Sequence, residues 1–168
     1  ARLEEARIQA AYARRAPEDT RYSWFNPAYL FMMHERERQV VALLQRYNIT
    51  ALHNKTILEI GCGKGYWLCE FIKWGARPEH VTGVELLPER VSEARHVCPE
   101  RVTIDCGSAA ALAYPTASFD LVVQSTVFTS ILDIEMKRRI ATEMLRVVKS
   151  EGLILWYDYH VNNPRNPD

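Results

Sequence analysis

The stretch of sequence that decides the fold is Ile57-Leu58-Glu59-Ile60-Gly61-Cys62-Gly63-Lys64-Gly65-Tyr66-Trp67. A short apolar run, typical of a buried strand, leads into three glycines at alternate positions and then into an amphipathic helical segment. Glycine lets the backbone turn sharply there and lets a ligand approach the main chain without interference from a Cβ atom. The helix that follows presents unpaired amides at its N-terminus. The stretch therefore predicts a ligand-binding loop between a strand and a helix.

An acidic residue closes the next predicted strand. Glu85 lies twenty residues after Gly65, and an acid at that position accepts hydrogen bonds from the two hydroxyls of a ribose. Dinucleotide-binding loops space their glycines as G-x-G-x-x-G, whereas the spacing here is G-x-G-x-G. Glu59, two residues before the first glycine, is poorly placed beside a pyrophosphate but suits a ligand that carries an ammonium group. The pattern disfavours NAD, and an NAD-dependent oxidoreductase stays open as the alternative.

The rest of the chain predicts the sheet around this loop. From Thr56 onwards, short apolar runs alternate with amphipathic helical stretches, which predicts an α/β fold with a doubly wound, mostly parallel sheet over residues 51–168. Continuous runs such as Leu121-Val122-Val123 are typical of strands buried on both faces. Residues 1–50 are expected to form an N-terminal helical extension or lid. The expected strands are 56–60, 80–85, 101–106, 120–124 and 152–159, and the expected helices are 3–15, 27–47, 65–74, 88–97 and 134–148.

Composition and charge argue against a nucleic-acid-binding protein and against a membrane-spanning protein. The 168 residues carry 21 Lys and Arg against 21 Asp and Glu, so the formal charge is zero. A protein that binds nucleic acid through phosphates normally has a basic excess, and no nucleic-acid partner is expected. No apolar run is long enough for a membrane span, so no membrane partner is expected either. The first residues do not resemble a signal peptide, and the four cysteines match neither a zinc site nor a disulfide framework. These features favour reduced thiols in a cytoplasmic protein without a bound metal.

Several motifs resemble those of class I S-adenosylmethionine-dependent methyltransferases. The segment from Glu59 to Gly65 is similar to the first motif of that family, and Glu85 matches its ribose-binding acid. Cys106-Gly107-Ser108-Ala109, with Leu112-Ala113-Tyr114-Pro115 and Ser118-Phe119-Asp120-Leu121-Val122 after it, resembles the G-D-A…L-P-F…F-D-L-V stretch. The segment from Arg146 to Gly152 resembles the L-K-P-G-G turn before strand five. The resemblance covers about residues 50–160. It implies a Rossmann-like fold, S-adenosylmethionine as cofactor, and these cofactor-binding residues: Glu59, Gly61, Cys62, Gly63, Gly65, Glu85, Leu86, Gly107, Ser108 and Ala109.

The chain departs from this family pattern in two ways. Ser108 stands where the family has the aspartate that contacts the adenine amino group. Family members also continue past strand five into a helix and an antiparallel hairpin, whereas this sequence stops at Asp168. Residues 153–157 would then form an apolar edge strand, and folded proteins normally cover such an edge. Either the natural protein continues, so that the C-terminal strands of the usual sheet are missing here, or a partner covers the edge, and we expect the first.

Catalytic and substrate residues are expected at the carboxyl ends of the strands, where open α/β sheets bind their ligands. Asp158 and His160 follow strand five and are the candidate bases, which only an acceptor that must lose a proton requires. Gln124 ends strand four and is expected at the methyl-donating end of the cofactor. Tyr22 belongs to the aromatic segment 22–25, which either covers the cofactor as a lid or anchors the N-terminal helix to the core.

Strand four lacks the Asn-Pro-Pro-Tyr type of motif with which the family methylates planar amines. With the neutral charge, this favours a small-molecule acceptor, and the resemblance extends to enzymes that modify sugars and secondary metabolites. A catalytically silent domain for cofactor binding or assembly stays open as a further alternative. The sequence also leaves open the identity of the acceptor and whether the chain forms a homo-oligomer.

Overall fold

The computed structural model describes residues 2–14 and 20–159. Its centre is a five-stranded, fully parallel sheet in the order β3-β2-β1-β4-β5. This arrangement confirms the predicted α/β class and the doubly wound parallel sheet. The strands are β1 (Ile57–Ile60), β2 (Val81–Glu85), β3 (Thr103–Cys106), β4 (Phe119–Ser125) and β5 (Val148–Tyr157). The helices are α1 (Arg2–Ala13), α2 (Pro27–Arg46), α3 (Tyr66–Lys73), α4 (Pro88–Val97) and α5 (Ile134–Val147), with single 3₁₀ turns at Thr20–Tyr22, Pro78–His80 and Phe128–Ser130.

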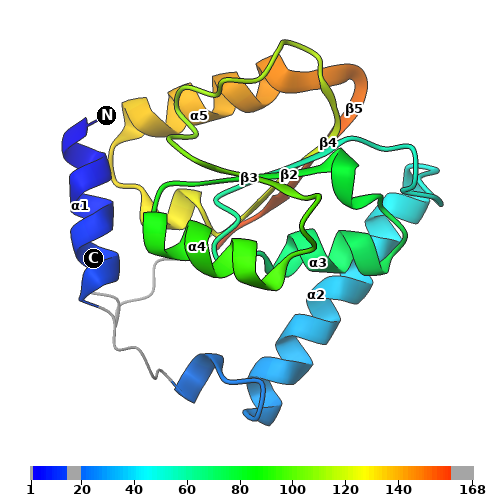
Figure 1. The fold of residues 1–168 in the computed structure, drawn as a ribbon, viewed down its shortest axis with the longest axis horizontal. Coiled ribbons are helices and arrows are strands. Elements are labelled where there is room, and N and C mark those ends of the chain that lie inside the picture. Colours follow the sequence, from blue (N-terminus) through cyan, green and yellow to red (C-terminus); the bar gives the residue numbers. More distant parts are fainter. Residues whose placement is uncertain (1, 15–19, 160–168) are drawn as a thin grey trace.

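Helices cover both faces of this sheet. In Figure 1, α3 and α4 lie on one side of the strands and α5 lies on the other. Alternation along β1 explains the two layers, because successive side chains of a strand point to opposite faces. Ile57 belongs to a buried cluster with Trp67, Leu68 and Phe71 of α3. Leu58, in contrast, packs in the second cluster, which includes Ile140, Met144 and Val147 of α5.

The two N-terminal helices belong to different layers. Asn26 caps α2 as expected, since its Oδ1 accepts the N–H of Ala28 at 3.1 Å. Leu44, near the other end of α2, is buried in the cluster on the α3 side of the sheet. Ile8 of α1 is buried in the cluster on the α5 side. The N-terminal residues are therefore built into both layers of the core.

The start of β5 differs from the sequence prediction. A turn was expected over residues 146–152, but α5 ends at Val147 and β5 begins at Val148 without a loop between them. Gly152 lies inside the strand, where an added Cβ would come within 2.7 Å of Val148 Cγ2 and 3.0 Å of the Asp120 carbonyl oxygen. Gly152 is thus explained by the close approach of its neighbours, and the prediction that it ends a turn was wrong.

Over residues 2–14 and 20–159, the edge strands of the sheet are β3 and β5. At the carboxyl end of β5, Trp156 is 50% exposed and Tyr157 is 38% exposed. The expectation of an apolar edge strand at this position is confirmed for these residues. Among the described helices, none combines the length and the apolar character that crossing a membrane requires.

Candidate active site

The glycine loop follows β1 and is folded against the end of β2. The amides of Gly61 and Cys62 both donate hydrogen bonds to the carbonyl oxygen of Val84, at 2.8 and 3.1 Å. Gly61, Gly63 and Gly65 have φ angles of +66°, +54° and +86°, in the left-handed region that residues with a Cβ rarely adopt. An added Cβ at Gly65 would also come within 2.6 Å of Cys98 Sγ. The backbone conformation and the close packing together explain why glycines stand here.

Glu85 links the end of β2 to this loop. Its Oε2 accepts the N–H of Gly63 at 2.9 Å, and its Oε1 accepts the N–H of Leu87 at 3.0 Å. The side chain is only 7% exposed. An ionised carboxylate can accept about four hydrogen bonds, so both oxygens retain capacity for further donors. Glu85 is thus an acid with a fixed orientation at the carboxyl edge of the sheet.

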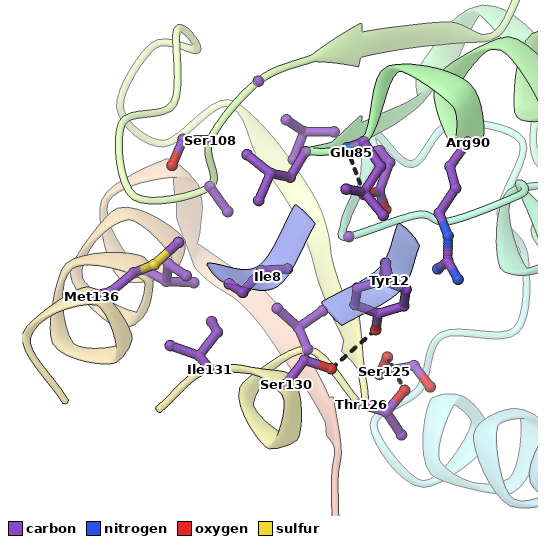
Figure 2. A pocket seen from close by; sticks show the side chains of 18 residues that line it. Ile8, Tyr12, Glu85, Arg90, Ser108, Ser125, Thr126, Ser130, Ile131 and Met136 are labelled. Carbon is purple, nitrogen blue, oxygen red and sulfur yellow. Dashed lines mark hydrogen bonds between the residues drawn. The ribbon is translucent and has the colours of Figure 1, made fainter. Parts of the chain in front are cut away.

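A pocket of about 690 Å³, including its open mouth, lies along this edge (Figure 2). Residues from four strand ends line it, as expected for an open α/β sheet. Its lining includes Gly61, Glu85, Leu86, Gly107, Ser108, Ala109, Ser125, Thr126 and Val127. Six of the residues predicted to bind the cofactor are therefore brought together around one cavity.

Two residues of α1 also line the pocket, and the sequence analysis missed both. Ile8 and Tyr12 point into the cavity from α1, which lies across it in Figure 2. The Tyr12 hydroxyl is 3.0 Å from Ser130 Oγ. The Arg90 guanidinium carbon lies 4.3 Å from the centre of the Tyr12 ring, a cation–π distance. The spacing of Ile8 and Tyr12, four residues apart on one helix face, was the available signal for this contact.

A cluster of polar contacts holds α1 against the turn after β4, and we call it the α1 latch. Glu4 accepts hydrogen bonds from Arg7 Nε at 3.0 Å and from the N–H of Leu132 at 2.6 Å. Arg7 Nη2 donates in turn to the Ser130 carbonyl oxygen at 2.6 Å. The Arg7 guanidinium, followed by the backbone amides of Leu132 and Asp133, outweighs the effect of burial and lowers the pKa of Glu4 to about 2. The latch therefore contains a carboxylate that is ionised at neutral pH.

Two of the residues predicted to bind the cofactor, one in β1 and one in the glycine loop, have side chains that do not line the pocket. Glu59 is 3% exposed and does not line the cavity. Burial first, and the neighbouring Glu85 second, raise the pKa of Glu59, while a hydrogen bond with the backbone of Leu68 opposes them. The Cys62 side chain is buried between β2 and α3, since a Cβ at Gly83 would come within 2.7 Å of its Sγ and 2.9 Å of Leu68. Burial also raises the pKa of the Cys62 thiol, which opposes a role as a nucleophile.

The polar side chain of Gln124 is also directed into the protein. Gln124 is fully buried, its Nε2 donates to the Tyr157 carbonyl oxygen at 3.2 Å, and its Oε1 accepts the N–H of Val127 at 3.1 Å. Its amide thus joins the carboxyl ends of β4 and β5. Ser125, the next residue, lines the pocket in its place.

The aromatic segment 22–25 is placed as an anchor of α2. Tyr22 is 62% exposed, packs edge-on against Tyr29 of α2, and is not among the pocket-lining residues. The Trp24 ring lies 5.3 Å from the ring of Tyr66, the first residue of α3. Of the two roles left open by the sequence, these contacts favour the anchor over the lid.

The structure describes one of the two candidate bases, Asp158. Asp158 Oδ2 accepts the N–H of Phe128 at 3.0 Å, which fixes the 3₁₀ turn after β4 to the end of β5. His160 lies outside the described residues. Within residues 2–14 and 20–159, no group of three or more His, Cys, Asp or Glu side chains is placed to hold a metal ion.

Comparisons with known proteins agree with this geometry. A family model described as a methyltransferase domain matches residues 57–152. A 2-methyl-6-phytyl-1,4-hydroquinone methyltransferase from Synechocystis is 33% identical over 113 residues, which are 66% of this chain and 34% of that protein. The matched parts span 34–43% of the length of the curated relatives.

Solved structures show the same fold. The PH0226 protein from Pyrococcus horikoshii superposes with a TM-score of 0.62 at 21% identity, over 79% of this chain and 56% of that one. An S-adenosylmethionine-dependent methyltransferase from Methanosarcina mazei is 28% identical, with a TM-score of 0.53 over 60% of this chain and 50% of that one. The glycine loop, the acid that ends β2 and the matching family model have one common explanation. The chain belongs to the methyltransferase-domain family, in the class I group whose cofactor is S-adenosylmethionine.

Proposed function

We propose that the protein transfers the methyl group of S-adenosylmethionine to a small molecule. The observation that carries this proposal is the position of Glu85, which is hydrogen-bonded to the glycine loop and still faces the pocket. A buried acid with spare acceptor capacity at the edge of the pocket suits the two hydroxyls of a ribose. The absence of a side chain at Gly63 suits close approach of the cofactor, because among the described residues only Arg90 Nη1, at 3.6 Å, lies near the position of its missing Cβ.

The pocket residues would hold the cofactor by their position along the sheet edge. Glu85 would accept the ribose hydroxyls, and Leu86, Ser108 and Ala109 would surround the adenine. Ser108 Oγ accepts the N–H of Ala110 at 3.3 Å, so its hydroxyl hydrogen is free to donate to a ring nitrogen. This would replace the contact that the family aspartate makes with the adenine amino group. Bound S-adenosylmethionine supplies an activated methyl group, and the main task of the protein is then to orient donor and acceptor.

The acceptor is proposed to be a small molecule. The pocket is bounded by α1 as well as by the sheet edge, which favours a compact ligand over an extended polymer. The zero formal charge disfavours a nucleic-acid substrate. The Synechocystis relative is named for a prenylated hydroquinone, which is a small molecule. Sugars and secondary metabolites belong to the same size class.

Proton removal, where the acceptor requires it, is assigned to the end of β5. His160 is the proposed base because it follows β5 in the sequence, and open α/β sheets bind their ligands beyond the carboxyl ends of the strands. Asp158 is proposed as a positioning residue, since its carboxylate already accepts the amide of Phe128.

The deciding experiment measures cofactor binding and turnover separately. Calorimetry with S-adenosylhomocysteine, S-adenosylmethionine and NAD should show binding of the first two and none of NAD. Mass spectrometry should then detect a gain of one methyl group on a member of a panel of phenols, carboxylic acids, amines and sugars. Binding of NAD alone would overturn the cofactor assignment. Tight binding of S-adenosylhomocysteine without turnover of any acceptor class would favour a catalytically silent module.

A further inference from the structure

Two cysteines from different helices lie in contact beside the last glycine of the loop. Cys69 stands near the start of α3, Cys98 directly follows α4, and their sulfur atoms are 3.6 Å apart. Both are free thiols. The sulfur atoms of a disulfide bond are about 2.0 Å apart, so a movement of about 1.5 Å would join the two side chains.

Both cysteines contact Gly65. The Gly65 carbonyl oxygen accepts the N–H of Cys69 at 3.1 Å and the S–H of Cys98 at 3.7 Å. The sulfur of Cys98 is also packed against the other side of this residue, since a Cβ at Gly65 would lie 2.6 Å from it. Protein interiors are close-packed and transmit displacements, so a movement of the Cys98 sulfur would reach the backbone of the glycine loop.

The two thiols differ in their access to solvent. Cys69 is partly exposed, whereas Cys98 is only 7% exposed. Burial first, and the neighbouring Cys69 thiol second, raise the pKa of the Cys98 thiol to about 12. A thiol reacts as the thiolate and must be reached by its oxidant, so Cys69 is the thiol that meets an oxidant from solution. Cys98 touches the Cys69 sulfur from the protein interior and is placed to react second.

We propose that Cys69 and Cys98 are a reversible modification site, which a small disulfide converts into a protein disulfide, and that this bond weakens cofactor binding through Gly65. The Cys69 thiolate attacks one sulfur of the small disulfide and releases one small thiol. The Cys98 thiol then loses its proton, and its sulfur attacks that of Cys69 and releases the second small thiol. The two protein thiols are thus oxidised by two electrons, and the small disulfide is reduced to two thiols.

The disulfide would change the contacts of Gly65 in two ways. A disulfide has no S–H group, so the hydrogen bond from Cys98 to the Gly65 carbonyl would be lost. The Cys98 sulfur would also move relative to the Gly65 backbone, against which it is packed. Gly63, two residues earlier in the same loop, donates its N–H to Glu85. The effect on the cofactor rests on the proposed methyltransferase function, whereas the formation of the disulfide does not.

The test treats the protein with glutathione disulfide and maps its disulfides by mass spectrometry of a non-reduced digest. The wild type should yield two peptides joined through Cys69 and Cys98, and the exposed Cys106 should carry glutathione, which shows that the oxidant has reacted. Calorimetry then uses Cys106→Ser, because an adduct at Cys106 would stand next to the pocket residue Gly107. S-adenosylhomocysteine should bind about fivefold or more weakly after oxidation, as is typical of coupled sites, and dithiothreitol should restore the affinity.

Two further variants separate the steps. In Cys98→Ser, Cys69 should retain glutathione as a mixed disulfide, because the thiol that would displace it has been removed. In Cys69→Ser, the buried Cys98 should stay unmodified, and with Cys106→Ser also present the cofactor affinity should no longer respond to glutathione disulfide.

The peptide map and the titration can each overturn the inference. A protein in which Cys106 is modified but Cys69 and Cys98 remain unlinked overturns it, and so does a linked protein that binds S-adenosylhomocysteine as tightly as the reduced one. Titration of the reduced protein reads out the proposed function separately. A lack of binding there removes the cofactor assignment, while the peptide map still decides whether the disulfide forms.

Discussion

The carboxylate of Glu85 accepts the backbone amide of Gly63 at 2.9 Å, so that the acid at the end of β2 is tied to the loop that follows β1. The second oxygen of the same carboxylate holds the amide of Leu87. The hydrogen bonds therefore fix the orientation of the acid before any ligand is considered. A site with fixed donors and acceptors loses less conformational entropy when it binds a ligand.

Glu85→Gln should weaken the binding of S-adenosylhomocysteine by about tenfold to a hundredfold. The change removes the charge that strengthens the hydrogen bonds to the ribose hydroxyls, and a hydrogen bond to a charged group contributes about 1.5–3 kcal/mol. Isothermal titration calorimetry measures the affinity. Glu89→Gln, at an exposed position in the first turn of α4, should leave it unchanged. Equal affinities of the wild type and Glu85→Gln would mean that Glu85 does not contact the ribose.

Gly63→Ala should affect mainly cofactor binding, whereas Gly65→Ala should also lower the stability of the fold. Within the described part of the chain, an alanine at Gly63 meets only the end of Arg90 at 3.6 Å, so the protein should lose about 1–2 kcal/mol from the left-handed backbone conformation alone. An alanine at Gly65 would also collide with Cys98 Sγ at 2.6 Å, which adds about 1–3 kcal/mol of overpacking. Urea denaturation measures both losses. Gly63→Ala should nevertheless abolish cofactor binding, and a Gly63→Ala protein that binds like the wild type would show that this loop position does not contact the cofactor.

Glu4→Gln should release the α1 latch and speed the dissociation of S-adenosylhomocysteine. The variant loses the charge that holds Arg7 and the Leu132 amide, so stopped-flow dissociation and amide hydrogen exchange at Leu132 should both become faster. Glu5→Gln, at the next position of α1, is the control. An unchanged dissociation rate would mean that α1 does not close the pocket.

The same latch should show a defined pH dependence. The folded pKa of Glu4 is lowered from 4.5 to about 2, so the stabilisation by its carboxylate is complete above about pH 4.5 and is lost as the pH falls towards 2. Dissociation of S-adenosylhomocysteine should therefore accelerate below about pH 4.5 in the wild type. This acceleration should be smaller in Glu4→Gln, where no carboxylate is left to titrate at that position.

Glu59→Gln should stabilise the protein at alkaline pH. Burial raises the folded pKa of Glu59 above its ordinary value of 4.5, so the folded state holds this proton more tightly than the unfolded state. The contribution is complete below about pH 4.5 and is lost as the pH rises through the folded pKa. Denaturant titrations at pH 5 and pH 8 should show a smaller loss of unfolding free energy in Glu59→Gln than in the wild type. Glu151→Gln, on the exposed surface of β5, should behave like the wild type.

The sheet and the glycine loop could be predicted because their signals are local in the sequence. Buried parallel strands are continuous apolar runs, as at Leu121–Val123, and a helix-starting loop with left-handed backbone conformations requires glycines. The orientation of Glu59 could also have been derived from the period of two along β1, since Glu59 shares its face with Ile57, on the side that α3 covers. Glu59 was expected to contact the ligand because of its charge, whereas the alternation of side chains along β1 places it on the buried face.

Other features depend on contacts between distant segments. The place of α1 is determined by Glu4, Arg7 and Tyr12, which bind a turn more than 115 residues away along the chain. The spacing of Ile8 and Tyr12 indicates an apolar face of α1, but no local pattern identifies the distant polar partners of Glu4 and Arg7. Gln124 was expected to face a ligand because it ends a strand, but its amide joins β4 to β5 instead. The amide partners become visible only when both strands are in place.

The pairing of β1 has a consequence for the synthesis of the chain. This central strand pairs with β4 as well as with β2, and the Asp120 carboxylate accepts the amide of Thr56 across a separation of 64 residues. On the ribosome, β1 leaves the exit tunnel long before β4, and one side of it stays without a hydrogen-bonded neighbour during that interval. An unpaired apolar strand is prone to aggregation. This side of β1 is therefore exposed to association with other chains until residues 119–125 emerge and complete the sheet.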